Sequence, residues 1–220
     1  MTGDFFRWDW AFDHLDLVVD GLREHFWLTF LAVGIGFAIS FPLALLAFRR
    51  RRFYGPLIAA SGVLYTVPSL ALFSFLVPFT GLSTTTAEVG LVSYTLLILV
   101  RNIVAGLDGV SEDAREAAQG MGFTPGQLLW RVEIPLAIPT IVAGLRIATV
   151  TTIGLVTVTA VIGKGGLGAL ILFGLQRTFS TAIIMGAVLS LLLAITVDFL
   201  LIRAERLVAP WSARRATRTV

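Results

Sequence analysis

The sequence has 220 residues, of which 56% are hydrophobic and only 14% charged, and its formal net charge is +3. Soluble domains carry about 25% charged residues, so the composition indicates a membrane protein and argues against a soluble enzyme or a nucleic-acid-binding protein. The chain has no cysteine, and its two histidines are His14 and His25. Thiol catalysis and thiolate metal sites are therefore excluded, and no metal site is expected.

Five segments are apolar enough, and long enough, to cross a hydrocarbon layer about 30 Å thick. They cover Phe26–Phe48, Tyr54–Phe79, Glu88–Leu107, Leu136–Ile162 and Phe179–Ile202. Pro68 lies near the middle of the second segment and removes a helical hydrogen bond there, so we expect this span to be the least regular. The sequence therefore predicts an all-α membrane protein with about five transmembrane helices.

The chain divides into three parts. Residues 1–25 mix aromatic and acidic side chains and place apolar residues at helical spacing. This pattern predicts an amphipathic helix at the extracytoplasmic membrane surface, with a frayed terminus as the alternative. We expect residues 26–203 to form the transmembrane domain and residues 204–220 to form a basic cytoplasmic tail.

The basic residues predict the orientation of the chain. Eleven of them lie in the first loop, the loop between spans three and four, and the C-terminal tail: Arg49, Arg50, Arg51, Arg52, Arg115, Arg131, Arg203, Arg206, Arg214, Arg215 and Arg218. Only four lie in the other loops: Arg7, Arg23, Lys164 and Arg177. The positive-inside rule therefore places the N-terminus outside and the C-terminus in the cytoplasm.

The segment 108–135, between spans three and four, is too polar to cross a membrane. We expect Gly120 and Gly122 to end a first short helix. Thr124 and Gln127 have the spacing of a capping box and begin a second one, and we expect Pro135 to end it. The result is a pair of short cytoplasmic helices around a glycine turn.

The string Glu116-Ala117-Ala118, then Gly122, and finally Val132-Glu133-Ile134-Pro135 resembles the EAA signature of ABC-importer permeases. The family pattern ends in Ile-x-Leu-Pro, so the Val and Ile here are conservative departures. In that family the segment is a coupling helix that docks in a groove of the cytoplasmic ATPase. The resemblance implies the type I ABC importer permease fold and the following coupling residues: Glu116, Ala117, Ala118, Gly122, Val132, Ile134 and Pro135.

Further strings resemble the osmoprotectant subfamily, whose members import glycine betaine, carnitine or choline: Tyr65–Ala71, Arg101-Asn102, Gly144–Arg146 and Ile162–Gly168. The resemblance implies a permease that forms the translocation path in a bacterial-type cytoplasmic (inner) membrane. The implied partners are two copies of an ATP-binding subunit, an extracytoplasmic solute-binding protein, and a second permease subunit, identical or homologous, with the heterodimer preferred. Lys164 stands where the subfamily more often has a small residue.

The chain itself is not expected to bind a cofactor or to be an enzyme; ATP and Mg would be bound by the partner ATPase. Gly163, Gly165 and Gly168 match the G-x-G-x-x-G spacing of dinucleotide-binding loops. They follow a membrane span rather than a β-strand, so we interpret them as a tight turn. A Walker A motif is absent, because Lys164 is followed by glycine instead of Ser or Thr.

Three charged residues, Arg101, Arg146 and Asp198, lie inside apolar spans, where such residues usually pair or serve function. Counting residues from the span ends places Arg101 and Asp198 at a similar depth, so we expect these two to pair.

Candidates for the translocation path come from spans two and three: Tyr65, Pro68, Ser69, Phe73 and Tyr94. The alternative function is a secondary transporter or channel for a small solute. Such a protein typically carries an internal repeat or more intramembrane charge, and neither is evident in this sequence.

Overall fold

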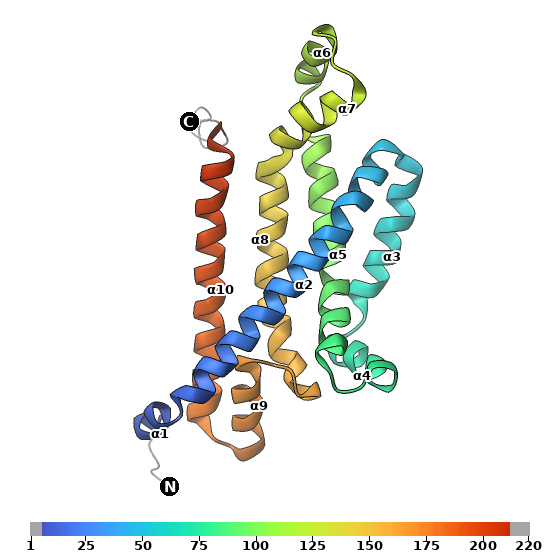
Figure 1. The fold of residues 1–220 in the computed structure, drawn as a ribbon. Coiled ribbons are helices and arrows are strands. Elements are labelled where there is room, and N and C mark those ends of the chain that lie inside the picture. The colour runs from blue at the N-terminus through green and yellow to red at the C-terminus, as the bar shows by residue number, and fades with distance from the viewer. Residues whose placement is uncertain (1–5, 212–220) are drawn as a thin grey trace.

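The computed structural model describes residues 6–211, which form helices joined by short turns (Figure 1). The elements are α1 (Trp8–Asp13), α2 (Leu15–Arg49), η1 (Arg51–Phe53), α3 (Tyr54–Thr66), α4 (Ser69–Thr80), α5 (Thr84–Asp108), α6 (Glu112–Gly120), α7 (Pro125–Leu128), η2 (Leu129–Glu133), α8 (Ile134–Val158), η3 (Thr159–Ile162), α9 (Leu167–Arg177) and α10 (Ser180–Val208). No residue of this range lies in a strand. The predicted all-α class is confirmed.

Within residues 6–211, four helices are long and apolar enough to cross a membrane: α2, α5, α10 and the continuous helical path Pro125–Ile162 that contains α8. The pair of α3 and α4, which is bent by 94°, makes a fifth crossing if it is counted as one broken span. The bend lies at Val67, whose backbone is extended (ψ 128°) because the residue before a proline avoids the helical region. The predicted irregular span is therefore two helices meeting at Pro68.

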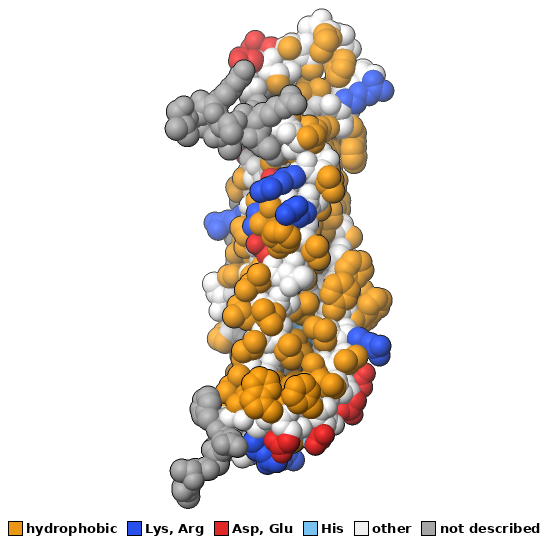
Figure 2. All heavy atoms as spheres, turned by 90° about the vertical axis from the view of Figure 1, so that its left-hand side faces the viewer, with side chains coloured by type: hydrophobic (Ala, Val, Ile, Leu, Met, Phe, Trp, Pro, Cys, Tyr) orange, Lys and Arg blue, Asp and Glu red, His pale blue; other side chains and the backbone are white. Residues whose placement is uncertain are grey.

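The spans run between two opposite ends of the molecule (Figure 1). The N-terminal helix α1, the helix α4 and the short helix α9 lie at one end, whereas α6, α7 and the last turns of α10 lie at the other. Figure 2 shows hydrophobic side chains over the middle of one face, with charged side chains mainly towards its two ends. This distribution suits a bundle that crosses a bilayer.

Helix α2 has 35 residues, which corresponds to about 52 Å. This exceeds the hydrocarbon thickness of about 30 Å, and Figure 1 shows the helix crossing the bundle diagonally. The predicted division at residue 25 falls inside α2, so residues 15–25 of the N-terminal segment and the first span share one helix. The division at residue 203 similarly falls inside α10. Residues 1–5 and 212–220 of these segments lie outside the described range.

Small side chains let α2 approach α5 closely. The buried residues of α2 include Ala32, Gly36, Ser40, Ala44 and Ala47, which recur at intervals of three or four. At Gly36 an added Cβ would overlap Thr95 Oγ1 of α5 and lie only 3.0 Å from Thr95 Cβ. Membrane helices lack a hydrophobic driving force between them and associate through such close packing.

Candidate coupling site and intramembrane polar groups

The glycine turn of the polar segment folds as its sequence predicts. Thr124 Oγ1 accepts a hydrogen bond from the backbone N–H of Gln127 (3.3 Å), and the Gln127 side chain accepts from the N–H of Thr124 (2.9 Å), which confirms the capping box. Gly122 has φ +81°, while an added Cβ would meet nothing within 4 Å. Glycine is therefore needed at this position for the backbone conformation and not for space.

The motif residues divide into an exposed and an inward-facing set. Glu116, Ala117 and Gly122 are exposed, whereas Ala118 is buried. Val132, Ile134 and Pro135 are half-buried. Two large apolar side chains beside them, Met121 and Trp130, are 69% and 60% exposed. The segment therefore presents a mixed polar and apolar surface at one end of the molecule.

The prediction that Pro135 ends the second short helix is wrong. The helical path continues through a π-helical turn, η2, and Pro135 stands in the first turn of α8. A proline ring clashes with the carbonyl four residues earlier in a regular α-helix, and a π turn widens the helix at that point. The coupling segment is consequently joined to span four without a break.

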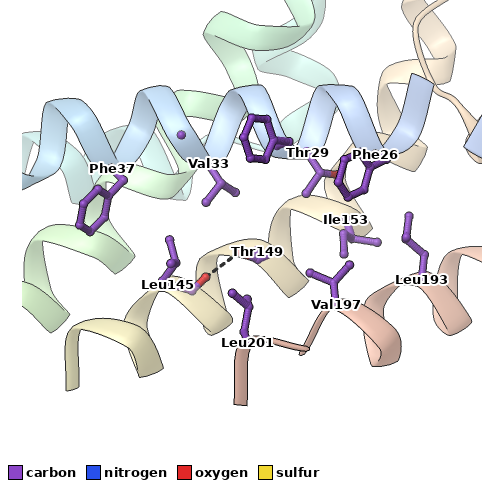
Figure 3. A pocket seen from close by; sticks show the side chains of 12 residues that line it. Phe26, Thr29, Val33, Phe37, Leu145, Thr149, Ile153, Leu193, Val197 and Leu201 are labelled. Carbon is purple, nitrogen blue, oxygen red and sulfur yellow. Dashed lines mark hydrogen bonds between the residues drawn. The ribbon is translucent and has the colours of Figure 1, made fainter. Parts of the chain in front are cut away.

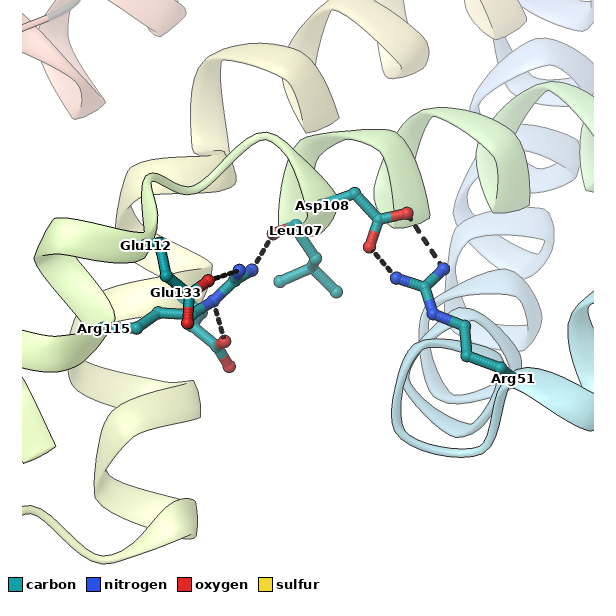
Figure 4. A network of polar contacts seen from close by, with 6 residues as sticks. All are labelled: Arg51, Leu107, Asp108, Glu112, Arg115 and Glu133. Atoms are coloured by element: carbon teal, nitrogen blue, oxygen red, sulfur yellow. Dashed lines mark hydrogen bonds and ion pairs between the residues drawn. The ribbon is translucent and has the colours of Figure 1, made fainter.

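Arg115 connects the parts of the coupling segment (Figure 4). Its Nε–H donates to Glu133 of η2 (2.9 Å), one terminal nitrogen donates to Glu112 (3.2 Å), and the other donates to the carbonyl oxygen of Leu107 at the end of α5 (2.8 Å). Burial disfavours its charge, but the two carboxylates outweigh burial and raise the pKa of Arg115 above its ordinary value. The Glu133 side chain is only 8% exposed, so this pair is largely removed from solvent.

A second ion pair joins the first loop to the same end of α5. Arg51 of η1 donates two hydrogen bonds to the carboxylate of Asp108, in a bidentate arrangement (Figure 4). Sequence reasoning assigned Arg51 and Arg115 to topology alone. Asp108 lies 57 residues from Arg51, and Glu133 lies 18 residues from Arg115; nothing in the local sequence specifies these two pairs. Glu133 stands at the position that the family pattern Ile-x-Leu-Pro leaves unspecified, so the motif assigns it no role.

The expected pairing of Arg101 with Asp198 is wrong. Asp198 of α10 accepts from Arg146 of α8, through Nε (2.8 Å) and Nη2 (3.0 Å). A residue count gives depth in the membrane but not which helices are neighbours, and α10 packs on α8 and α9. Arg101 is exposed and has no ion-pair partner within residues 6–211. The Arg146 and Asp198 side chains remain 29% and 32% exposed.

Four of the five path candidates gather at the bend between α3 and α4. The rings of Tyr65 and Tyr94 contact edge to face with 5.9 Å between centroids, and the Tyr94 hydroxyl donates to the carbonyl of Val67, beside Pro68 and Ser69. Phe73 is instead 2% exposed and packs against Gly90 of α5. In this structure Phe73 belongs to the core.

An apolar cavity of about 300 Å³ lies between α2, α8 and α10 (Figure 3). Its few polar groups include the hydroxyls of Thr29 and Thr149, and the latter already donates to the carbonyl of Leu145 (2.7 Å). Three phenylalanines, Phe26, Phe30 and Phe37, also line it, but no charged side chain does, so we do not place the path of a polar solute there.

A family model described as "Binding-protein-dependent transport system inner membrane component" matches residues 28–210. The chain is 39% identical over 196 residues to the osmoprotectant import permease protein OsmW of Salmonella typhimurium, covering 87% of this chain and 91% of the relative. It is 38% identical over 187 residues to the glycine betaine/carnitine/choline transport system permease protein OpuCB of Bacillus subtilis, covering 85% and 86%.

A solved structure supports the same assignment. A chain of the MetNI methionine ABC transporter, in an inward-facing conformation, matches with a TM-score of 0.78 and 25% identity over 89% of this chain and 98% of that chain. The members of this family are multi-pass transport subunits and not enzymes. The chain belongs to the family of binding-protein-dependent transport system inner membrane components, the membrane-spanning permease subunits of ABC importers.

Proposed function

We propose that this permease imports a small quaternary ammonium osmoprotectant, such as glycine betaine, carnitine or choline. A partner ATPase, which would bind ATP and Mg, drives this import by hydrolysing ATP. The observation that carries the proposal is the coupling segment, 108–135: an exposed glycine turn that Arg115 ties to the end of span three and that continues into span four without a break. The solute class comes from the names of the two relatives.

The proposed docking surface consists of Glu116, Ala117 and Gly122 together with the exposed Met121 and Trp130. Ala118 and the half-buried Val132, Ile134 and Pro135 support this surface from within. Two ATPase subunits would each receive one such segment, from this chain and from a second permease, identical or homologous. A solute-binding protein would deliver the solute at the opposite end.

The coupling role is tested with two glycines that differ in one property. Gly120 and Gly122 both have free space where a Cβ would lie, but only Gly122 has a positive φ. Gly122→Val should therefore reduce ATPase co-purification and ATP-driven uptake in proteoliposomes, because a β-branched residue is an outlier at that φ. Gly120→Val serves as the control. Equal uptake and equal ATPase binding by both variants would remove the coupling assignment.

The proposed orientation places the N-terminus outside and the C-terminus in the cytoplasm, because the end of the molecule with α6 and α7 also carries Arg49–Arg52. The chain has no cysteine, so single introduced cysteines report unambiguously. Leu82, between α4 and α5, and Leu207, at the end of α10, are 68% and 83% exposed. A membrane-impermeant thiol reagent added outside intact cells should label Leu82→Cys and not Leu207→Cys. The reverse pattern would show that the chain has the opposite orientation.

The proposed translocation path runs along the outer face of the bend between α3 and α4, where Tyr65 is 39% exposed and Pro68 is exposed. Arg146 and Asp198 are proposed to tie spans four and five together. In the assembled importer, Tyr65→Cys and Ser69→Cys should react with a small water-soluble thiol reagent more slowly when transported solute is present. Unchanged rates at both positions would place the path elsewhere.

A further inference from the structure

A cavity of about 470 Å³ lies at the end of the molecule that carries the N-terminus, between the first turns of α2 and the helix α9. Its volume falls within the range of about 300–1,000 Å³ that is typical of small-molecule pockets. Trp10 of α1 contributes to its wall from a third element. The cavity is distinct from the bend between α3 and α4 and from the coupling segment.

One wall of this cavity is aromatic. The rings of Trp10 and Phe173 lie nearly parallel, with 6.2 Å between centroids, and Phe179 contacts Trp10 edge to face at 4.9 Å. The guanidinium carbon of Arg177 lies 4.2 Å from the centroid of the Phe173 ring. This ring therefore already interacts with a cation, through the attraction of positive charge to the π face.

The facing wall is acidic. Asp20 and Glu24 are four residues apart on α2, so they lie on the same face of the helix. A carboxylate oxygen of Glu24 accepts a hydrogen bond from the backbone N–H of Gly166 (3.1 Å), which fixes this side chain across the gap between α2 and the start of α9. The Asp20 side chain is 78% exposed, and its nearest cation is Arg23 at 3.9 Å. A ligand cation would therefore compete with the exposed Arg23 for this carboxylate.

We propose that this cavity binds the quaternary ammonium group of the transported solute before it enters the membrane path. A quaternary ammonium donates no N–H hydrogen bond, so proteins recognise it through aromatic faces and carboxylates, and this cavity offers both. The inference rests on the proposed function for the solute class. It assigns to the permease itself a recognition step at the end that the proposed orientation places outside.

The choline headgroup of a phospholipid has the same chemistry as the free solute, so the test separates the two sources. The full-length chain is reconstituted in nanodiscs of phosphatidylethanolamine and phosphatidylglycerol, and equilibrium binding of radiolabelled choline is measured. Binding should saturate and should be displaced by tetramethylammonium but not by 3,3-dimethylbutan-1-ol, the uncharged carbon analogue of choline. Nanodiscs that contain phosphatidylcholine should give the same affinity; loss of choline binding there would assign the cavity to lipid headgroups and overturn the proposal.

Three variants test whether choline binds in this cavity. Asp20→Asn and Trp10→Leu should each raise the Kd for choline by about fivefold or more, the effect of losing roughly one cation–π or ionic contact. Arg177→Gln should lower the Kd, because it removes a competing positive charge from the Phe173 ring. Asp13→Asn is the matched control, since Asp13 is exposed on α1 and does not line the cavity. If Trp10→Leu fails to fold, the exposed Asp20→Asn decides alone.

Equal affinity of the wild-type chain, Asp20→Asn and Arg177→Gln would overturn the site, as would the absence of choline binding to the wild type. ATP-driven choline uptake by the complete importer is measured in parallel. Uptake without binding to the chain would refute this site and leave the proposed function standing, whereas a complete importer that takes up none of the three osmoprotectants would refute the proposed function.

Discussion

The hydroxyl of Tyr94 on α5 donates a hydrogen bond to the backbone carbonyl of Val67, at the point where α3 and α4 bend by 94°. In a continuous helix this carbonyl would accept from the N–H four residues later, but the bend ends α3 at Thr66. A backbone group left unpaired within a membrane is costly, so Tyr94 supports the broken helix from the neighbouring span.

Tyr94→Phe should therefore lower the free energy of unfolding of the purified permease by about 1–3 kcal/mol, the cost of an unsatisfied buried acceptor. Tyr65→Phe is the matched control, because its ring lies beside Tyr94 but no hydrogen bond of its hydroxyl occurs within residues 6–211. The melting temperatures of both variants in the same detergent provide the measurement. A Tyr94→Phe protein as stable as Tyr65→Phe would show that the bend does not depend on this contact.

The pair formed by Arg146 and Asp198 predicts a specific pattern of rescue. Asp198→Asn or Arg146→Gln alone leaves one charge uncompensated at membrane depth, which costs up to about 3 kcal/mol and less where the side chain reaches water. The yield of folded protein should fall in each single variant and recover in part when both changes are combined.

The control for this pattern is the combination of Arg101→Gln with Asp198→Asn, which should give no recovery because Arg101 is not paired with Asp198. Size-exclusion profiles of fluorescently tagged variants measure the yield. Recovery in the Arg101 combination, but not in the Arg146 combination, would restore the pairing expected from sequence depth. The variant Arg146→Lys should recover little of the yield that Arg146→Gln loses, since lysine cannot form the two parallel hydrogen bonds to Asp198.

Sequence reasoning was successful where the signal is local. Apolar runs of about 20 residues identified the spans, Pro68 marked the bend, and the spacing of Thr124 and Gln127 gave the capping box. It failed where the answer depends on which helices are neighbours. Residue counting estimates depth but not adjacency, so Asp198 was assigned to the wrong arginine. The helix α9 was missed because its 11 residues are too short for a span.

The Arg115–Glu133 pair should determine whether the coupling segment moves as one body with span four. Glu133→Gln keeps the shape but removes the charge beside Arg115, and breaking a largely buried pair costs about 3 kcal/mol. We expect faster proteolysis between α6 and α7 and weaker stimulation of the partner ATPase by solute. Glu112→Gln is the control, because Glu112 is 69% exposed and should change little. Equal effects of both changes would show that Glu133 has no special role.

The contact between Gly36 and Thr95 sets the distance between α2 and α5, and it predicts a pair of compensating substitutions. Gly36→Ala adds a Cβ that overlaps Thr95 Oγ1, so α2 must shift or the Thr95 side chain must turn, at a cost of about 1–3 kcal/mol. Removing that oxygen with Thr95→Ala leaves only the Thr95 Cβ, at 3.0 Å, within reach of the new methyl group. The double variant Gly36→Ala/Thr95→Ala should therefore recover part of the melting temperature that Gly36→Ala loses.

The control for this prediction lies two residues away on the same helix. Gly34 has nothing within 4 Å of an added Cβ, so Gly34→Ala adds the same methyl group without an overlap and should leave the melting temperature unchanged or slightly raise it. Helix propensity favours alanine over glycine at both positions, and only the contact with α5 separates them. A Gly36→Ala protein that is as stable as Gly34→Ala would show that α2 and α5 do not pack at this distance in the membrane.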